Sequence, residues 1–256
     1  MKLIDTHTHL YLKEFENDID EVIQRANAAG VKKFYLPAID SSESEAQLAL
    51  EKKYPDQVFA MAGLHPCSVK ENFQDELELV DEQLSKRKFA GIGETGLDFY
   101  WDTTYKKEQY ESLHIHAHWA IQYKRPLVLH TRNATCETID ALDQYKGKGL
   151  YGIYHCFSGS LEEAKQIIEA GFYLGIGGVL TFKNSGLADV IKNIDLQKLV
   201  LETDAPYLAP VPFRGKRNES SYLKNIVEKL AEIKNVSVEE AAQQTSKNAE
   251  FLFSEK

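Results

Sequence analysis

The sequence has few cysteines and lacks the long apolar runs from which membrane-spanning helices are built. Three cysteines occur in 256 residues, an odd number at wide spacing, which favours a reducing compartment over a disulfide framework. No signal-peptide pattern is found at the N-terminus, and no apolar run approaches the roughly 20 residues of a membrane span. These absences predict a cytoplasmic protein that does not contact a membrane.

Basic charge is also scarce. The chain has 30 Lys and Arg against 39 Asp and Glu, a net charge of -9. This balance excludes a broad basic surface that would wrap nucleic acid. An anionic substrate must therefore be held by a local group of cations. Since no linker, low-complexity tract or repeat divides the chain, its length predicts one metal-dependent hydrolase barrel domain over residues 1–256.

Strand-like and helix-like patterns alternate along the chain, which predicts an α/β fold, a single (β/α)8 TIM-type barrel. The expected strands are Lys2–Thr6, Lys33–Ile39, Val58–Leu64, Phe89–Gly93, Pro126–Leu129, Tyr151–Tyr154, Phe172–Ile176 and Lys198–Glu202. Helical patterns such as Asp18–Ala29 and Leu161–Ala170 lie between them. Two additional C-terminal helices, Glu219–Lys234 and Ser237–Phe253, are expected to pack on the outside of the barrel.

Ligand-type side chains follow five of these strands. They are His7 and His9, then Glu94, His130, His155 and Asp204. The carboxyl ends of barrel strands converge on one face, where such barrels keep their catalytic groups. His7 and His9 are two apart on an extended segment and point to the same side, and Asp5 is expected to share that direction one layer deeper. Four imidazoles and two carboxylates suit one or two divalent ions, which Glu94 could bridge.

Several motifs resemble those of one known family. They are D5-T-H-T-H-L10, G63-L-H-P66, G93-E-T-G-L-D-F99, L129-H-T-R132, H155-C-F-S-G159, G175-I-G-G178, L180-T-F-K183, L201-E-T-D-A-P-Y-L-A-P210 and R214-G-K-R-N-E219. In this order, over nearly the whole chain, they closely resemble the TatD family of metal-dependent deoxyribonucleases within the amidohydrolase-like barrels.

The resemblance implies a ligand set and a reaction. One ion would be held by His7, His9, Glu94 and Asp204, and a second by Glu94, His130 and His155. The implied reaction is hydrolysis of phosphodiester bonds in DNA, as a 3′–5′ exonuclease on single strands, with Asp204 and Glu94 as catalytic residues. Asp204 would act as the general base on a metal-activated water. The choice among Mg, Mn and Zn stays open, because imidazoles favour zinc or manganese whereas the family's nuclease activity is usually supported by magnesium.

Five further residues are expected to contact the substrate. The resemblance implies this role for His65, whose alternative is a hydrogen-bonded histidine at the rim of the barrel. Arg132 has the forked geometry that clamps a phosphate, and its alternative is a salt bridge within the rim. Arg214, Lys216 and Arg217 form a basic loop after the last strand, where a nucleic-acid backbone would dock.

Other polar residues are expected to be structural. His114, His116 and His118 lie in the helical pattern Thr104–Tyr123, where residues two apart diverge, so no metal site is expected there. Glu202 is expected to point inward and form hydrogen bonds behind the ligands. Ser220 stands where the family pattern usually has proline, a change expected to loosen the loop.

Two other functions remain open. One is a barrel hydrolase of esters or amides, such as a lactone, a cyclic amide or an aminoacyl-tRNA ester, although a small uncharged substrate would not require the basic loop. The other is a non-catalytic binding module that keeps the barrel, although the complete set of six ligand-type residues speaks against it. The sequence does not predict the oligomeric state.

Overall fold

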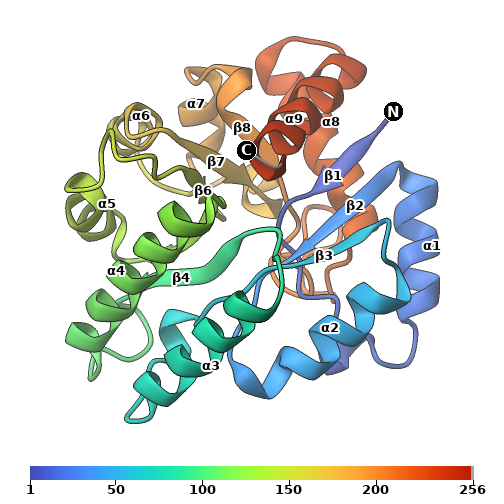
Figure 1. Cartoon of the computed structure of the whole chain (residues 1–256). Helices are drawn as coiled ribbons and strands as arrows, with labels where there is room; N and C mark the ends of the chain where they lie inside the picture. Colours follow the sequence, from blue (N-terminus) through green and yellow to red (C-terminus); the bar gives the residue numbers. More distant parts are fainter. Residues whose placement is uncertain (255–256) are drawn as a thin grey trace.

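The computed structural model describes residues 1–254, and positions 255 and 256 of the expected 1–256 domain lie outside the described residues. Strands and helices alternate along the chain (Figure 1). The strands are β1 Leu3–Asp5, β2 Val31–Leu36, β3 Val58–Ala60, β4 Ile92–Asp98, β5 Leu127–Arg132, β6 Gly152–Tyr154, β7 Phe172–Ile176 and β8 Leu199–Leu201. The helices are α1 Ile19–Ala29, α2 Ser44–Lys53, α3 Phe73–Lys86, α4 Lys106–Tyr123, α5 Thr135–Asp143, α6 Leu161–Glu169, α7 Leu187–Lys192, α8 Leu223–Lys234 and α9 Val238–Phe253.

The eight strands are parallel and follow the order of the sequence. They form two hydrogen-bonded sheets, β1-β2-β3 and β4-β5-β6-β7-β8. Backbone hydrogen bonds join the sheets at both seams: Gly93 N donates to Ala62 O at 2.7 Å, and Thr6 N donates to Leu201 O at 3.0 Å. Helices surround the strands (Figure 1). The predicted TIM-type α/β fold is thereby confirmed, and each expected strand has a counterpart.

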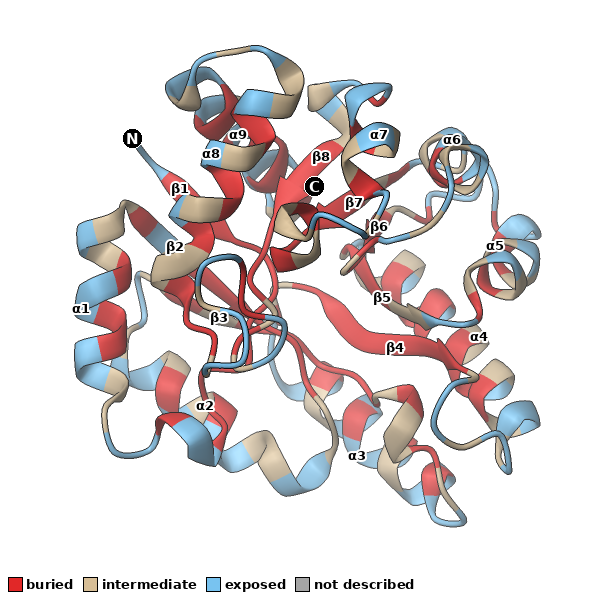
Figure 2. Cartoon of the chain, turned by 180° about the vertical axis from the view of Figure 1, so that it is seen from behind, coloured by how far each residue is buried: buried red, intermediate tan, exposed pale blue. Residues whose placement is uncertain are grey.

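β4 differs most from its expected position. It was expected at Phe89–Gly93 but spans Ile92–Asp98, so Glu94 lies inside the strand and not after it. All seven of its residues are buried, as the red ribbon in Figure 2 shows. Two glycines permit close contact with β5: a Cβ at Gly96 would lie 2.0 Å from His130 O, and one at Gly93 would lie 2.6 Å from Val128 O.

The C-terminal helix α9 closes the barrel at the amino ends of the strands, opposite to their carboxyl ends. Buried Ala249 and Leu252 of α9 belong to one apolar cluster with residues of the strand interior, Ile4, Tyr35, Met61, Val128, Ile153 and Val200. Asn248 donates hydrogen bonds to Leu196 O and Leu199 O, where β8 begins. α9 lies outside the strands, as expected, and its apolar face covers the amino end of the strand interior, a position that the sequence did not predict.

Helix ends follow the expected local chemistry. Ser160 caps α6 through a reciprocal pair of bonds with Glu163, and Gly30 ends α1 in the left-handed conformation with a φ of 101°. Within the described part of the chain, no helix is both long and apolar enough to cross a membrane.

Candidate metal centre

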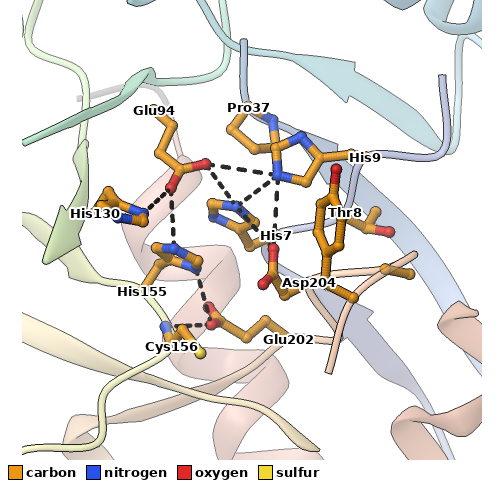
Figure 3. A network of polar contacts seen from close by, with 12 residues as sticks. His7, Thr8, His9, Pro37, Glu94, His130, His155, Cys156, Glu202 and Asp204 are labelled. Carbon is orange, nitrogen blue, oxygen red and sulfur yellow. Dashed lines mark hydrogen bonds and ion pairs between the residues drawn. The ribbon is translucent and has the colours of Figure 1, made fainter. Parts of the chain in front are cut away.

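The six predicted ligands converge at the carboxyl ends of the strands (Figure 3). β1 ends at Asp5, and the chain then bends so that His7 and His9 reach the centre. Backbone bonds hold this bend against the end of β8: Asp204 N donates to His7 O at 2.9 Å, and His9 N donates to Ala205 O at 2.8 Å. The first and last strands thus position three of the ligands together.

Glu94 lies between two pairs of imidazoles. Its Oε2 is 3.0 Å from His7 Nε2 and 3.6 Å from His9 Nε2. Its Oε1 is 2.9 Å from His130 Nδ1 and 3.0 Å from His155 Nε2. Each carboxylate oxygen therefore faces its own pair, the arrangement that a bridging ligand requires.

Asp204 completes the His7–His9 side of the centre. Its Oδ1 is 3.7 Å from His7 Nε2 and 3.6 Å from His9 Nε2. Asp204 has a φ of 56°, in the left-handed region that non-glycine residues adopt uncommonly and that recurs at functional sites. The neighbouring backbone is fixed by Asn218, whose side chain donates to Thr203 O and Tyr207 O. The carboxylate thus has a defined direction.

Polar groups behind three of the histidines face the ring nitrogen that points away from the centre. Asp98 Oδ2 lies 2.9 Å from His130 Nε2, and Glu202 Oε1 lies 3.3 Å from His155 Nδ1. His9 Nδ1 lies 2.9 Å from the hydroxyl of Tyr11, and this hydroxyl donates its own hydrogen bond to the Pro37 carbonyl. In each case the rear nitrogen faces an acceptor and carries the proton. The front nitrogen therefore presents a lone pair to the centre, as a metal ligand must.

His65 has the opposite arrangement. Its Nδ1 accepts a hydrogen bond from Cys67 N at 3.0 Å, so the proton of the neutral ring lies on Nε2. That Nε2 is 3.4 Å from Glu94 Oε1 and 3.3 Å from His130 Nδ1. The ring reaches the centre as a hydrogen-bond donor and not as a lone-pair ligand. This geometry supports its predicted role as a substrate contact.

The donor set fits divalent cations. Three groups of ligand atoms each lie close enough to share an ion: His7, His9 and Glu94; His7, His155 and Asp204; His65, Glu94 and His130. The tautomer of His65 argues against its membership of the third group. His130 Nδ1 and His155 Nε2 lie 2.9 and 3.0 Å from Glu94 Oε1, so the two nitrogens and this oxygen are close enough to share one cation.

The two central carboxylates are ionised. Burial alone would raise the pKa of Glu94, but the neighbouring imidazoles of His155 and His7 lower it well below its usual value. Burial likewise opposes ionisation of Asp204, but the neighbouring imidazoles of His155 and His7 lower its pKa. Both groups are therefore anionic at neutral pH, as ligands of a divalent cation must be.

Two carboxylates lie behind the candidate ligands, and the sequence analysis predicted only one of them. Glu202 was expected to point inward and does, and Gly175 makes room for it, since a Cβ there would lie 2.2 Å from Glu202 Oε2. Asp98 was missed, although it is 1% exposed and contacts His130. Its position as the last residue of β4, inside the motif that contains Glu94, is the signal that could have revealed it.

Asp5 does not share the direction of His7 and His9, contrary to expectation. Its carboxylate accepts from Thr203 N at 2.9 Å and from the hydroxyls of Thr203 and Ser220, each at 2.6 Å. The chain bends directly after Asp5, so strand alternation does not continue to His7. Asp5 instead fixes the residue that precedes Asp204.

The predicted substrate contacts have different environments. Arg132 is exposed and stacks on the ring of Tyr100, and Arg214 stacks on Phe182, with 3.9 and 4.0 Å from guanidinium carbon to ring centroid. Phe182 and Arg214 line one surface hollow together with Lys183.

Lys216 is exposed, whereas Arg217 forms a two-pronged ion pair with Asp18, at 2.8 and 2.6 Å, and also donates to Glu14 O. The guanidinium of Arg217 thus has protein partners. It anchors the 214–217 loop to the segment before α1, and its contact with a substrate stays a prediction.

The histidines of α4 lie apart from the centre. His116 is fully buried, accepts from Leu64 N at 3.0 Å and lies 2.7 Å from Ser112 O. His114 contacts the hydroxyl of Tyr145 at 3.1 Å. None of the ligand groups found among residues 1–254 includes His114, His116 or His118. His114 and His116 thus contact protein groups away from the centre, and their absence from metal binding stays a prediction.

Comparisons with known proteins find relatives over nearly the whole chain. The family model described as TatD related DNase matches residues 4–254. The chain is 37% identical to "Uncharacterized metal-dependent hydrolase YabD" of Bacillus subtilis (strain 168), over 98% of both chains. It is 32% identical to "3'-5' ssDNA/RNA exonuclease TatD" of Citrobacter rodentium, over 98% of this chain and 97% of that protein. The solved structure of YjjV, a TatD homologue from Escherichia coli K12, superposes with a TM-score of 0.92 at 31% identity, covering 98% and 97% of the two chains.

Proposed function

The chain belongs to the TatD-related DNase family of metal-dependent hydrolases, and we propose that its substrate is single-stranded DNA, which it degrades from the 3′ end. The observation that carries the proposal is Glu94, whose two oxygens face two separate pairs of imidazoles. Such a bridge suits two ions that act on the same phosphodiester. The name of the Citrobacter relative supports the direction of cleavage and the single-stranded substrate.

One ion would be held by His7, His9, Glu94 and Asp204, and the second by Glu94, His130 and His155. When bound, the ions would polarise the phosphodiester and lower the pKa of water. The four imidazole nitrogens favour zinc or manganese over magnesium, because magnesium prefers oxygen ligands and retains its waters. Asp98, Glu202 and Tyr11 face the rear nitrogens of His130, His155 and His9 as acceptors, which favours the ligand tautomer of these three rings.

The residues of the chain supply the proton transfer and the substrate contacts. Asp204 is ionised and can take a proton from the attacking water as the general base. The Nε2–H of His65 can donate to a non-bridging oxygen of the phosphate. Arg132, two residues after His130 on β5, has the fork geometry for a neighbouring phosphate.

The basic loop after β8 would hold the DNA backbone beyond the reacting phosphate. Arg214 and Lys216 are exposed and available for this contact. The ion pair between Arg217 and Asp18 holds the loop in place. Local cations of this kind are what a chain of net charge -9 requires to bind a polyanion.

The proposal is tested by turnover of end-labelled oligonucleotides with Mg, Mn or Zn. A single strand labelled at its 5′ end should give a ladder of progressively shortened products, whereas a 3′ label should be released at once as a mononucleotide. Glu94→Gln should abolish cleavage. His118→Gln, which removes an imidazole outside the centre, should not.

The same experiment includes the other substrate classes. Duplex DNA, RNA, a lactone and an aminoacyl ester are compared at equal concentration. If the lactone or the aminoacyl ester is hydrolysed while the oligonucleotides stay intact, that compound and not DNA represents the substrate class. RNA cleaved as fast as DNA would broaden the substrate to single-stranded nucleic acid.

A further inference from the structure

Two large aromatic side chains are exposed beside the metal centre. Tyr100 is 52% exposed and Trp101 is 67% exposed, and both follow directly after β4. The other tryptophan of the chain, Trp119, is 9% exposed and belongs to the apolar core. Exposing this much aromatic surface costs free energy, and side chains of this kind on a functional face commonly serve as contacts for a ligand.

A single carboxylate connects this aromatic turn to the metal centre. Asp98 Oδ1 accepts hydrogen bonds from Tyr100 N at 2.9 Å and from Trp101 N at 3.0 Å. Its other oxygen, Oδ2, lies 2.9 Å from His130 Nε2, behind the ligand nitrogen of that ring. The position of the aromatic pair is thereby fixed relative to the metal centre through one side chain.

The aromatic pair has a cation stacked on it. The rings of Tyr100 and Trp101 meet edge to face, with centroids 4.8 Å apart and an interplanar angle of 85°. The guanidinium carbon of Arg132 lies 3.9 Å from the Tyr100 centroid and 5.0 Å from the Trp101 centroid. Flat apolar surfaces beside a cation are complementary to a nucleobase beside its phosphate.

We propose that Tyr100, Trp101 and Arg132 form a stacking platform for an unpaired base of the DNA strand whose phosphate lies at the metal centre. This inference rests on the proposed function and explains its preference for single strands. A base within a duplex has both faces covered by its neighbours, whereas an unpaired base offers a face to an aromatic ring. Because every base has such a face, the platform accepts any sequence.

The charge of the molecule makes such a platform valuable. With a net charge of -9, the chain repels a polyanion at long range, and only a few local cations offset this. Stacking on the platform does not depend on the overall charge. It also places the strand so that the phosphate next to the stacked base enters the metal centre, through the Asp98–His130 connection.

Trp101 provides a direct measure of binding that does not require cleavage. In the metal-loaded Trp119→Phe variant, the remaining tryptophan fluorescence comes from Trp101, since the chain has 2 tryptophans. The probe is a phosphorothioate oligothymidylate, which resists hydrolysis, and its control is an abasic oligonucleotide with the same number of phosphates. We expect saturable quenching by the first and much weaker quenching by the second.

Substitutions test the same contact in otherwise wild-type protein. Trp101→Ala should weaken binding of the oligothymidylate, measured by fluorescence anisotropy of a labelled strand, by roughly 5- to 150-fold, the range found for one stacked base. Its affinity for the abasic strand should change little. Phe251→Ala, which removes an exposed ring on α9, is the matched control and should bind both strands like wild type. Metal content and circular dichroism of each variant check the fold.

The outcomes separate this inference from the proposed function. Equal quenching by the abasic strand, or unchanged affinity in Trp101→Ala, would overturn the platform even if DNA is cleaved. Base-dependent quenching without cleavage of an ordinary oligonucleotide would support the platform and overturn the proposed nuclease activity. Loss of metal in Trp101→Ala, with both strands weakened equally, would make the pair a structural support of the metal centre and overturn the stacking role.

Discussion

Among the single residues of the centre, Asp204 has two proposed roles, metal ligand and general base, that one substitution can separate. In Asp204→Asn the amide oxygen keeps a weak ligand, but the side chain can no longer accept a proton from water. We expect turnover to fall by about 10²–10⁴-fold, the typical contribution of a positioned general base, with a much smaller fall in metal content. Steady-state hydrolysis and elemental analysis measure the two quantities. Turnover within a few-fold of wild type would assign the base to another group.

Ser220 was expected to loosen its loop because it replaces a proline, yet it makes a contact that proline could not. Its hydroxyl donates to the buried carboxylate of Asp5 at 2.6 Å, and both residues are 0% exposed. Burial raises the pKa of Asp5 to about 7, which the bonds from Ser220 and Thr203 oppose. The carboxylate therefore depends on these donors whenever it is ionised.

For Ser220→Ala we predict a loss of about 1–3 kcal/mol in the free energy of unfolding, because one donor to a buried carboxylate disappears. The loss should be larger above pH 7, where Asp5 is ionised, than near pH 5. Urea unfolding at both pH values measures it, with exposed Ser85→Ala as the control. If Ser220→Ala and Ser85→Ala lose the same free energy of unfolding, the contact with Asp5 is not the cause of the loss.

The convergence of the candidate ligands could be predicted from the sequence, but the state of each ring could not. His7, Glu94 and Asp204 were recognisable because ligand-type residues stand within or just after apolar strands. The tautomers of His65 and His130 depend on Cys67 and Asp98, contacts that no periodicity reveals. For the same reason the sequence could not show that Arg217 is paired with Asp18 while Arg132 stacks on Tyr100.

At the scale of elements, His116 connects α4 to the loop after β3. The buried imidazole accepts from Leu64 N, next to His65, and burial lowers its pKa to about 4. The folded state therefore keeps this ring neutral above pH 4, whereas the unfolded chain takes up a proton below its ordinary value of 6.5. Stability from this residue is present above pH 6.5 and is lost as the pH falls toward 4.

Compared with His116→Gln, the wild type should lose about 3 kcal/mol more unfolding free energy between pH 6.5 and pH 4, from the 1.36 kcal/mol of each pKa unit. Denaturant unfolding over this range measures the difference. His118→Gln on the exposed side of the same helix should follow the wild-type curve. Parallel curves for wild type and His116→Gln would contradict a neutral, buried ring.

The helix α9 should contribute stability without contributing to the reaction. Leu252 is 0% exposed and packs among residues of the strand interior, whereas neighbouring Phe251 is 56% exposed. Leu252→Ala should reduce the free energy of unfolding by about 2–5 kcal/mol, the usual cost of such a buried truncation. Phe251→Ala should change it little. DNA hydrolysis by folded Leu252→Ala protein should remain near wild type, and a large loss of activity would mean that α9 reaches the metal centre.

The number and order of the elements could be predicted, because the alternation of patterns and the helix caps are local. Their boundaries and partners were less accessible. β4 extends beyond its expected end since Gly93 and Gly96 permit pairing close to β5, which is a property of two strands together. The position of α9 depends on the open amino end of the strand interior, which exists only after the strands have assembled.

At the scale of the whole molecule, the apolar core and the candidate metal centre use different residues. The apolar clusters consist of strand, helix and loop residues, and none of the six candidate ligands belongs to them. Backbone hydrogen bonds fix the part of the centre that contains His7, His9 and Asp204. Glycines of β4 hold Glu94 close to β5. A domain of this size buries about three quarters of its unfolded surface, so its fold does not require the ions.

Chelation should therefore abolish hydrolysis and leave a folded protein. Far-ultraviolet circular dichroism should be unchanged at room temperature after treatment with a chelator and dialysis. The thermal midpoint should fall by a finite amount, because an ion that binds only the native state stabilises it in proportion to the logarithm of its concentration over Kd. Re-addition of one metal at a time should restore both activity and midpoint. Global unfolding on chelation would instead show that the fold requires the ions, and the ligand groups would then have a structural role.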